Sequence, residues 1–213
     1  HAQQLLDGLP GATKEKFARV FMEMCEHNNP MQLAVVGAFS AGKSSLVNGL
    51  LGGQWLYTAQ QEATSLPVFI QYSSDTEMKL VNENDEHIVL DQEQFSRVTT
   101  VAPEGASYAT LGLNQGWLKD LILIDLPGLG SVSERNHAYT LAQIKMADVV
   151  VYLLSQRGPT AADLKMIKLI QSYGKYVLVA VSHWDEVEAS IALGEKAPDL
   201  EQWLDIIKKE TGY

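Results

Sequence analysis

The chain contains the octapeptide Gly37-Ala38-Phe39-Ser40-Ala41-Gly42-Lys43-Ser44, which matches the pattern G-x-x-x-x-G-K-[ST] at every fixed position. The apolar run 33–36 before it predicts a buried strand, and residues 44–51 predict a helix that stops at Gly52-Gly53. In such a glycine-rich turn, backbone N–H groups point inward and bind phosphate oxygens. We call residues 37–44 the phosphate loop.

The side chains at the end of the phosphate loop have predicted chemical roles. Lys43 should reach the β- and γ-phosphates of a nucleoside triphosphate, and the Ser44 hydroxyl should bind Mg²⁺. Further along, Asp125-Leu126-Pro127-Gly128 closes the apolar run 121–124. An acidic residue at such a strand end orients magnesium through water, and a glycine N–H can approach a γ-phosphate closely. The sequence therefore predicts one Mg²⁺ site served by Ser44 and Asp125.

Short apolar runs alternate with helical patterns along the chain, which predicts an α/β fold with a mostly parallel central sheet. Continuous apolar runs typical of strands covered on both faces lie at residues 121–124, 149–154 and 177–181. Further strands are expected at residues 66–72, 77–81 and 87–90, and helices at 91–98, 134–146, 161–173 and 199–210. Residues 103–116 have no clear pattern and are assigned to a loop.

Composition limits the possible partners and compartment. The 26 acidic and 16 basic side chains give a formal net charge of −10, which argues against nucleic-acid binding because phosphate neutralisation needs clustered Lys and Arg. The single cysteine, Cys25, allows no internal disulfide and fits a reducing compartment. The apolar runs are far shorter than the roughly 20 residues that span a bilayer, and no secretory signal is visible. We therefore expect a cytoplasmic protein.

Taken together, the motifs resemble those of dynamin-superfamily GTPases, particularly the bacterial dynamin-like proteins. The resemblance runs from about residue 33 to residue 185 and rests on four segments in the family's order: residues 36–48 as phosphate loop, 63–67 and 125–129 as first and second switch, and 147–155 as the next core strand. It implies a three-layer P-loop fold of the Ras-like G-domain type. It also implies that GTP or GDP binds with Mg²⁺, sometimes with a monovalent cation such as K⁺, and that GTP is hydrolysed.

The same resemblance assigns roles to further residues. Thr64 would ligate magnesium and sense the γ-phosphate, with Thr58 in the same loop as the alternative. Ser40 matches a position that helps to stabilise the transition state, so the implied catalytic residues are Ser40, Lys43 and Thr64. The implied nucleotide contacts are Gly37, Ala38, Phe39, Ser40, Ala41, Gly42, Lys43, Ser44, Ser45, Asp125, Gly128, His183 and Asp185, and the implied metal ligands are Ser44, Thr64 and Asp125.

Two positions depart from the usual GTPase patterns. Leu129 is apolar and cannot orient water, so hydrolysis must use another arrangement, which in the family is assembled when two G domains pair. Guanine is usually read by [NT]-K-x-D, whereas this chain has Ser182-His183-Trp184-Asp185. Asp185 can accept from guanine N1–H and N2–H₂, worth about 1–3 kcal/mol of base discrimination. Its alternative role is an acidic helix cap.

The residue in the lysine position is His183. Its ring could stack over the base where a lysine stem would lie, although its charge would depend on pH. Arg157, in the loop after the run 149–154, is a candidate to approach the nucleotide or a partner G domain, and a solvated loop residue is the alternative.

The expected organisation is an N-terminal segment, residues 1–30, followed by a dynamin-type G domain, residues 31–213, that ends before its last strand and helix. Residues 13–27 predict an amphipathic helix, either one piece of a neck bundle or packed on the G domain. The resemblance implies a second copy of the G domain as partner and membrane remodelling at the inner face of the membrane through other regions. A non-hydrolysing nucleotide-sensing module is the alternative.

Overall fold

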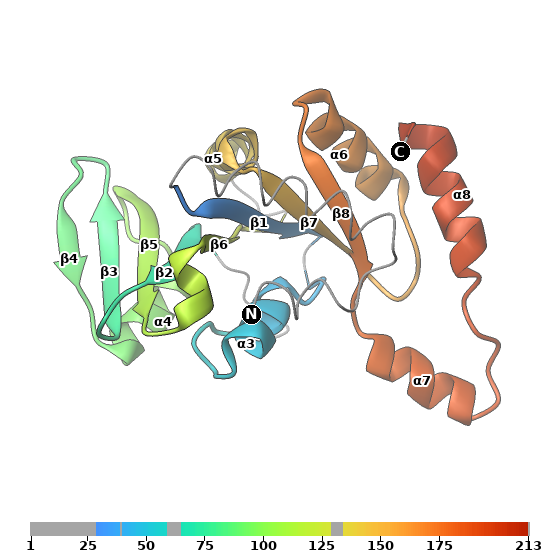
Figure 1. Ribbon diagram of the computed structural model, residues 1–213, viewed down its shortest axis with the longest axis horizontal. Helices are drawn as coiled ribbons and strands as arrows, with labels where there is room; N and C mark the ends of the chain where they lie inside the picture. The colour runs from blue at the N-terminus through green and yellow to red at the C-terminus, as the bar shows by residue number, and fades with distance from the viewer. Residues whose placement is uncertain (1–28, 39, 59–64, 129–133, 213) are drawn as a thin grey trace.

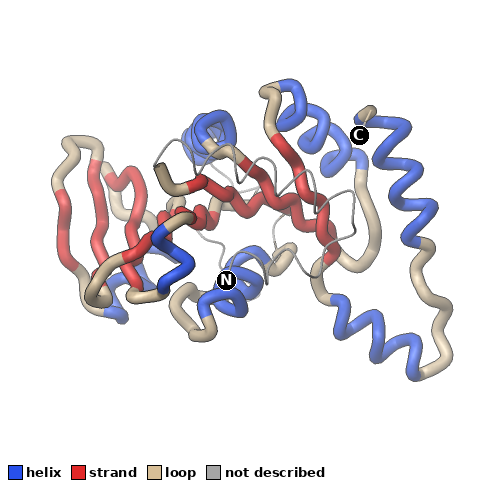
Figure 2. The backbone as a smooth tube through the Cα atoms, viewed as in Figure 1, coloured by secondary structure: helices blue, strands red, loops and turns tan. Residues whose placement is uncertain are grey.

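An eight-stranded sheet crosses the middle of the molecule and carries helices on both faces (Figure 1). The structure is a computed structural model that describes residues 29–38, 40–58, 65–128 and 134–212, without the side chains of residues 134–139. The strand order is β4-β3-β5-β2-β6-β1-β7-β8. Figure 2 shows the strands as a continuous layer between helices, so the predicted three-layer α/β fold is confirmed.

The half of the sheet that carries the phosphate loop is parallel. β1 (Met31–Gly37) lies between β6 (Leu121–Asp125) and β7 (Val149–Leu154), and β8 (Tyr176–Val181) lies beside β7. These strands contain the continuous apolar runs, as expected for parallel strands covered by helices. Because all four run in the same direction, their carboxyl ends meet at one edge, outside which open α/β sheets bind their ligands.

The other half of the sheet makes it mixed rather than mostly parallel. β2 (Val68–Tyr72) pairs antiparallel with β6 but parallel with β5 (Ala106–Leu113). β3 (Glu77–Asn82) pairs antiparallel with β5 and with the short edge strand β4 (His87–Val89). Three of the seven pairs between described strands are therefore antiparallel.

The prediction of a loop at residues 103–116 was wrong, because β5 occupies much of it. Small residues in the segment Ala106–Leu113 obscure the alternation of apolar and polar residues expected of a strand. Ala109, Leu111 and Leu113 are nevertheless buried. A Cβ at Gly112 would lie 2.7 Å from the Cβ of Ser73, so only glycine allows this approach. Pairing with strands on both sides makes this segment a strand, since tertiary context overrides weak β-propensity.

Two apolar layers attach the helices to the sheet. On one face, α3 (Lys43–Leu51) and α4 (Gln92–Thr100) bury Val47, Leu51 and Phe95 against the strands. On the other, α5 (Glu134–Met146) and α6 (Ala161–Ser172) bury Ile144, Ile167 and Ile170, and α8 (Leu200–Thr211) adds Ile207. A short 3₁₀ helix, η1 (Gly116–Lys119), links β5 to β6.

The predicted helices after residue 29 are confirmed, and one helix was not predicted. Asp91 and Thr160 each form a capping box, at the start of α4 and α6, which explains where these helices begin. The unpredicted helix is α7 (Trp184–Ala192), which begins within the tetrapeptide 182–185. The helix expected at residues 13–27 lies outside the described residues. Among those described, none of the helices has the length and hydrophobicity needed to cross a bilayer.

A buried polar pair ties β7 to the start of α6. The Tyr152 hydroxyl donates to Asp163 Oδ1 at 2.8 Å, while Thr160 donates to the other carboxylate oxygen through its backbone N–H at 2.8 Å and its hydroxyl at 2.6 Å. Burial, with the hydrogen bond to Asp163 and the charge of that carboxylate, raises the pKa of Tyr152. The phenol therefore remains a donor to the carboxylate.

Replacing Tyr152 by Phe should destabilise the fold by about 1–3 kcal/mol, since the nearly buried Asp163 carboxylate loses a donor. Urea unfolding measures the change. The matched control is Tyr176→Phe, on an edge strand with the ring 45% exposed, which should change stability by less than about 0.5 kcal/mol. Equal effects of the two substitutions would contradict a stabilising role for the buried pair.

Candidate nucleotide-binding site

The phosphate loop connects the carboxyl end of β1 to the first turn of α3. Ser40 and Gly42 adopt left-handed backbone conformations, with φ of 57° and 77°. Gly42 caps α3 without a side-chain hydrogen bond, and the first turn of this helix has no acidic residue. The N-terminus of this helix, with its partial positive charge, is therefore suited to bind an anion. Phe39 lies outside the described residues.

The Lys43 side chain folds back under the phosphate loop. It is only 7% exposed, and its Nζ donates to the carbonyl of Ala38 at 3.0 Å and to that of Gly37 at 3.4 Å. Burial lowers the pKa of Lys43, and the charge of Asp125 opposes this in part. A desolvated ammonium group beside open backbone N–H groups is suited to bind a polyphosphate, whose charge would offset the cost of its burial.

Ser44 and Asp125 meet at the edge of the sheet. The register of β1 and β6 places Val35 opposite Asp125, so the end of β6 lies beside the phosphate loop. The Ser44 hydroxyl donates to Asp125 Oδ2 at 2.8 Å, and Asp125 is fully buried. A hydroxyl and a carboxylate this close are the oxygen donors that Mg²⁺ uses at few-ligand protein sites, where phosphates and water complete the octahedron. The residues therefore fit the expected metal ion.

The tetrapeptide 182–185 lies directly against the phosphate loop. Ser182 donates to the Leu154 carbonyl through its N–H and its hydroxyl, at 2.9 and 3.0 Å, which holds the end of β8 against β7. A Cβ built on Gly42 would lie 3.4 Å from His183 Nε2. The histidine ring thus packs on the phosphate loop. Stacking of this ring over a base stays a prediction.

Asp185 stands in the first turn of α7 with an exposed side chain. Its carboxylate makes no hydrogen bond that the described residues reveal, so it can accept from a ligand. The N-cap position of α7 belongs to His183, which makes no side-chain capping bond. Asp185 therefore lies in the first turn, one position after Trp184, and both its base-reading role and its alternative role at the helix N-terminus stay predictions.

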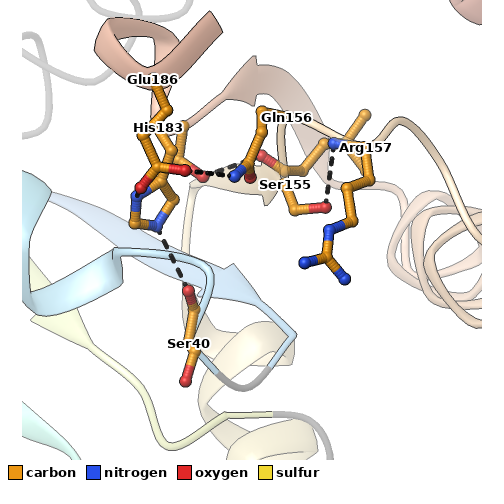
Figure 3. A network of polar contacts seen from close by, with 8 residues as sticks. Ser40, Ser155, Gln156, Arg157, His183 and Glu186 are labelled. Atoms are coloured by element: carbon orange, nitrogen blue, oxygen red, sulfur yellow. Dashed lines mark hydrogen bonds and ion pairs between the residues drawn. The ribbon is translucent and has the colours of Figure 1, made fainter. Parts of the chain in front are cut away.

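The structure brings most of the predicted site residues to one edge of the sheet, and two, Phe39 and Thr64, lie beyond its described part. Described residues of the predicted site are Gly37, Ala38, Ser40, Ala41, Gly42, Lys43, Ser44, Ser45, Asp125, Gly128, His183 and Asp185. Phe39, Thr64 and Leu129 lie outside, whereas Thr58, the alternative switch residue, is exposed. Arg157 is exposed on the loop after β7 (Figure 3), and the contacts proposed for it remain a prediction.

Asn48 is a buried residue whose role the sequence did not indicate. From α3, its Oδ1 accepts from the backbone N–H groups of Trp55 and Leu56 at 3.0 and 2.9 Å, and its Nδ2 donates to the Leu56 carbonyl at 2.7 Å. It thereby fixes the segment that leads to Thr58. The sequence offered one signal for this role: Asn48 is a polar residue in the middle of a predicted helix and lies within the segment 36–48 that carries the resemblance.

Comparison with known proteins gives a consistent result. Residues 33–184 match the sequence profile of the Dynamin family. The chain is 25% identical over 185 residues to the probable transmembrane GTPase FZO-like, chloroplastic, of Arabidopsis thaliana, covering 86% of this chain and 18% of that protein. It is 28% identical over 163 residues to Dynamin-like protein 2 of Campylobacter jejuni, covering 75% of this chain and 27% of that protein.

The similarity extends to a solved structure. A chain from an oligomerised bacterial dynamin pair, described as a mechanism for long-range sensing and tethering of membranes, superposes with a TM-score of 0.60 at 20% identity, covering 90% of this chain and 33% of that one. At this identity the match supports the fold. The chain spans less than half the length of these relatives.

Replacing Gly37 by Ala should destabilise the fold by about 1–3 kcal/mol, the cost of overpacking. The new Cβ would lie 2.7 Å from the backbone carbonyl oxygen of Leu153, which cannot rotate away. Gly49→Ala is the matched control, because a Cβ there meets nothing within 4 Å in the exposed middle of α3. It should stabilise by about 0.5–1 kcal/mol. Denaturant midpoints measure both, and a neutral Gly37→Ala would contradict the close approach of β1 and β7.

Proposed function

Because the chain belongs to the dynamin family, we propose that it binds GTP with Mg²⁺ and hydrolyses it to GDP and phosphate. One observation supports this most directly: Lys43 lies buried beneath the phosphate loop, while Ser44 and Asp125 meet at 2.8 Å beside it. An ammonium group, a helix N-terminus and a pair of oxygen donors thus converge where a triphosphate and its metal ion would bind.

The chemistry follows from this arrangement. Phosphoryl transfer needs little covalent help, so a protein accelerates it by positioning and by neutralising charge. Lys43 and the first-turn N–H groups of α3 would neutralise the β- and γ-phosphates. Ser44 and Asp125 would hold Mg²⁺, which would supply positive charge to the triphosphate. The N–H of Gly128, three residues after the end of β6, would contact the γ-phosphate.

Leu129 follows Gly128 and is apolar, so it cannot orient the attacking water, and other residues must do so. Ser40 is exposed in the phosphate loop and is our candidate for stabilising the transition state. Thr64 would complete the metal site and the water position. A K⁺ ion would add charge near Ser40 once a second G domain covers the site.

We further propose that two copies of the chain pair through their nucleotide sites. The candidate contacts among the described residues lie at the carboxyl edge of the sheet, so a second copy placed there would exclude water from the reaction. Other regions of a longer protein would couple this pairing to membrane remodelling at the inner face of a membrane. Relatives named as a transmembrane GTPase and as membrane-tethering dynamins support this extension.

A second candidate function is a nucleotide sensor that does not hydrolyse. It is favoured by His183 in the lysine position and by the apolar Leu129. Turnover of GTP and ATP, measured with K⁺ at several protein concentrations, separates the two. Nucleotide binding without turnover under every condition would favour the sensor, whereas turnover that rises with protein concentration would favour the hydrolase.

Lys43→Ala should weaken GTP binding at least about 100-fold, the combined worth of two charge-assisted hydrogen bonds. Calorimetric titration with GTP and Mg²⁺ measures the loss. Lys165→Ala, an exposed lysine on α6, removes the same charge away from the site and should bind normally. Micromolar affinity retained by Lys43→Ala would count decisively against the site.

Asp185→Asn should shift the preference from GTP toward XTP, because the amide N–H₂ opposes guanine N1–H but suits the xanthine carbonyl. The expected change in the GTP/XTP affinity ratio is about 10- to 100-fold. The control is Asp205→Asn, exposed on α8, which should leave the ratio unchanged. A preference of the unmodified protein for ATP would overturn the assignment of Asp185 to guanine.

A further inference from the structure

Asn48 lies on the helix that begins at the phosphate loop, and it is only 3% exposed. Ser44 and Asn48 are about one turn apart in α3, so they lie on the same side of the helix, about 6 Å apart along its axis. The Ser44 hydroxyl contacts Asp125, whereas the Asn48 amide contacts the chain that leaves the helix. One short helix thus carries a predicted metal ligand and the attachment point of the loop that follows.

The amide of Asn48 uses its whole hydrogen-bonding capacity. Its oxygen accepts from the N–H groups of Trp55 and Leu56, and its nitrogen donates to the Leu56 carbonyl. The nitrogen also donates to Gln54 Oε1 at 3.3 Å. An amide offers two acceptor positions and two N–H donors, and all four are matched here. The side chain therefore holds Leu56 through both its N–H and its carbonyl, as a neighbouring strand would.

Two glycines return the chain from the end of α3 to this side chain. Gly52 has a left-handed backbone, with φ of 66°, and its N–H donates to the Asn48 carbonyl. The N–H of Gly53 donates to the same carbonyl at 3.2 Å. A Cβ at Gly53 would lie 2.6 Å from Trp55 Nε1, so the tryptophan ring closes over the turn. Asn48 thus fixes the path to Leu56 through its backbone as well as its side chain.

The end of α3 is also held from η1. Gln115 Nε2 donates to the Leu51 carbonyl at 2.8 Å, and Gln115 Oε1 accepts from Trp117 Nε1 at 2.8 Å. Leu51 is the last residue of α3, where helix carbonyls lack partners within the helix. Because η1 leads into β6, which ends at Asp125, both ends of α3 are fixed relative to the strand that carries the other predicted metal ligand.

The loop between Leu56 and Ser65 contains both candidate switch threonines. Thr58 lies two residues after Leu56, and Thr64, itself outside the described residues, directly precedes Ser65. Ser65 donates to the Thr99 carbonyl, in the last turn of α4, through its N–H at 2.8 Å and its hydroxyl at 3.2 Å. The described residues on the two sides of this loop are therefore attached to α3 and to α4.

We propose that Asn48 is a positioning residue that orders the start of the loop between Leu56 and Ser65 before nucleotide binds, and so raises the affinity for a triphosphate over a diphosphate. This rests on the proposed function, in which a threonine of this loop contacts the γ-phosphate and Mg²⁺. Because folding already fixes Trp55 and Leu56, their conformational entropy is not lost again when the triphosphate binds. GDP has no γ-phosphate, so its affinity does not depend on this ordering.

The test measures the affinities for GDP and for a non-hydrolysable GTP analogue, both with Mg²⁺, for the unmodified protein and for Asn48→Ala. The substitution should lower the affinity for the analogue relative to GDP about 5- to 30-fold, the cost of ordering one residue. Tyr152→Phe is the matched control, because it removes a buried hydrogen bond on the other face of the sheet and should leave the ratio unchanged. An unchanged ratio in Asn48→Ala, with GDP still bound, would overturn the inference and leave the proposed function standing.

Hydrogen exchange on the unmodified protein tests the same inference without a substitution. Coupling is reciprocal, so a triphosphate that benefits from the ordered loop must stabilise that order in return. The amide protons of Trp55 and Leu56 should therefore exchange more slowly with the analogue than with GDP, when both are measured against the Leu164 amide in α6. Equal protection with the two nucleotides would overturn the role of Asn48. Absence of binding of either nucleotide would overturn the proposed function and this inference together.

Discussion

The parallel packing of β1 between β6 and β7 determines where the phosphate loop and Asp125 lie relative to one another. Its register sets Val35 beside Asp125 and Gly37 beside Leu153, so the phosphate loop and the end of β6 emerge at the same level. The absence of a side chain at Gly37 makes this spacing possible, because a Cβ there would meet the Leu153 carbonyl at 2.7 Å. Once these strands are in register, Ser44 can reach Asp125 and the loop after β8 can reach the phosphate loop.

The site also contains two buried charged groups, whose removal from water costs free energy. A buried lysine and a fully buried aspartate lie together under a helix N-terminus, and burial lowers the pKa of Lys43 despite the nearby carboxylate. Burying these two charged groups costs folding free energy. Binding of an anion and a cation of matching charge recovers that cost, so it favours binding of a metal–polyphosphate complex.

The fold was largely predictable because its strong signals are local. Continuous apolar runs, capping residues and the glycine-rich octapeptide each report the conformation of a few consecutive residues, and the strands and helices that they predicted after residue 29 are present. β5 was missed because its strand character comes from β2 and β3 on either side, which no local pattern of small residues reveals. The mixed character of the sheet was hidden for the same reason, since strand direction depends on pairing.

Lys43 and Ser44 could be identified from the spacing within the phosphate loop, because a backbone wrapped around phosphate requires those residue types close together in the chain. Asp125, 81 residues after Ser44, could be identified from its place at the end of an apolar run. Asn48 and Gln115 could not, because their partners lie in other segments and their residue types are common on any surface. Only folding determined that the ring of His183 packs on Gly42. Such contacts depend on how distant segments are packed, and a side chain's direction in space is not encoded by its neighbours in the sequence.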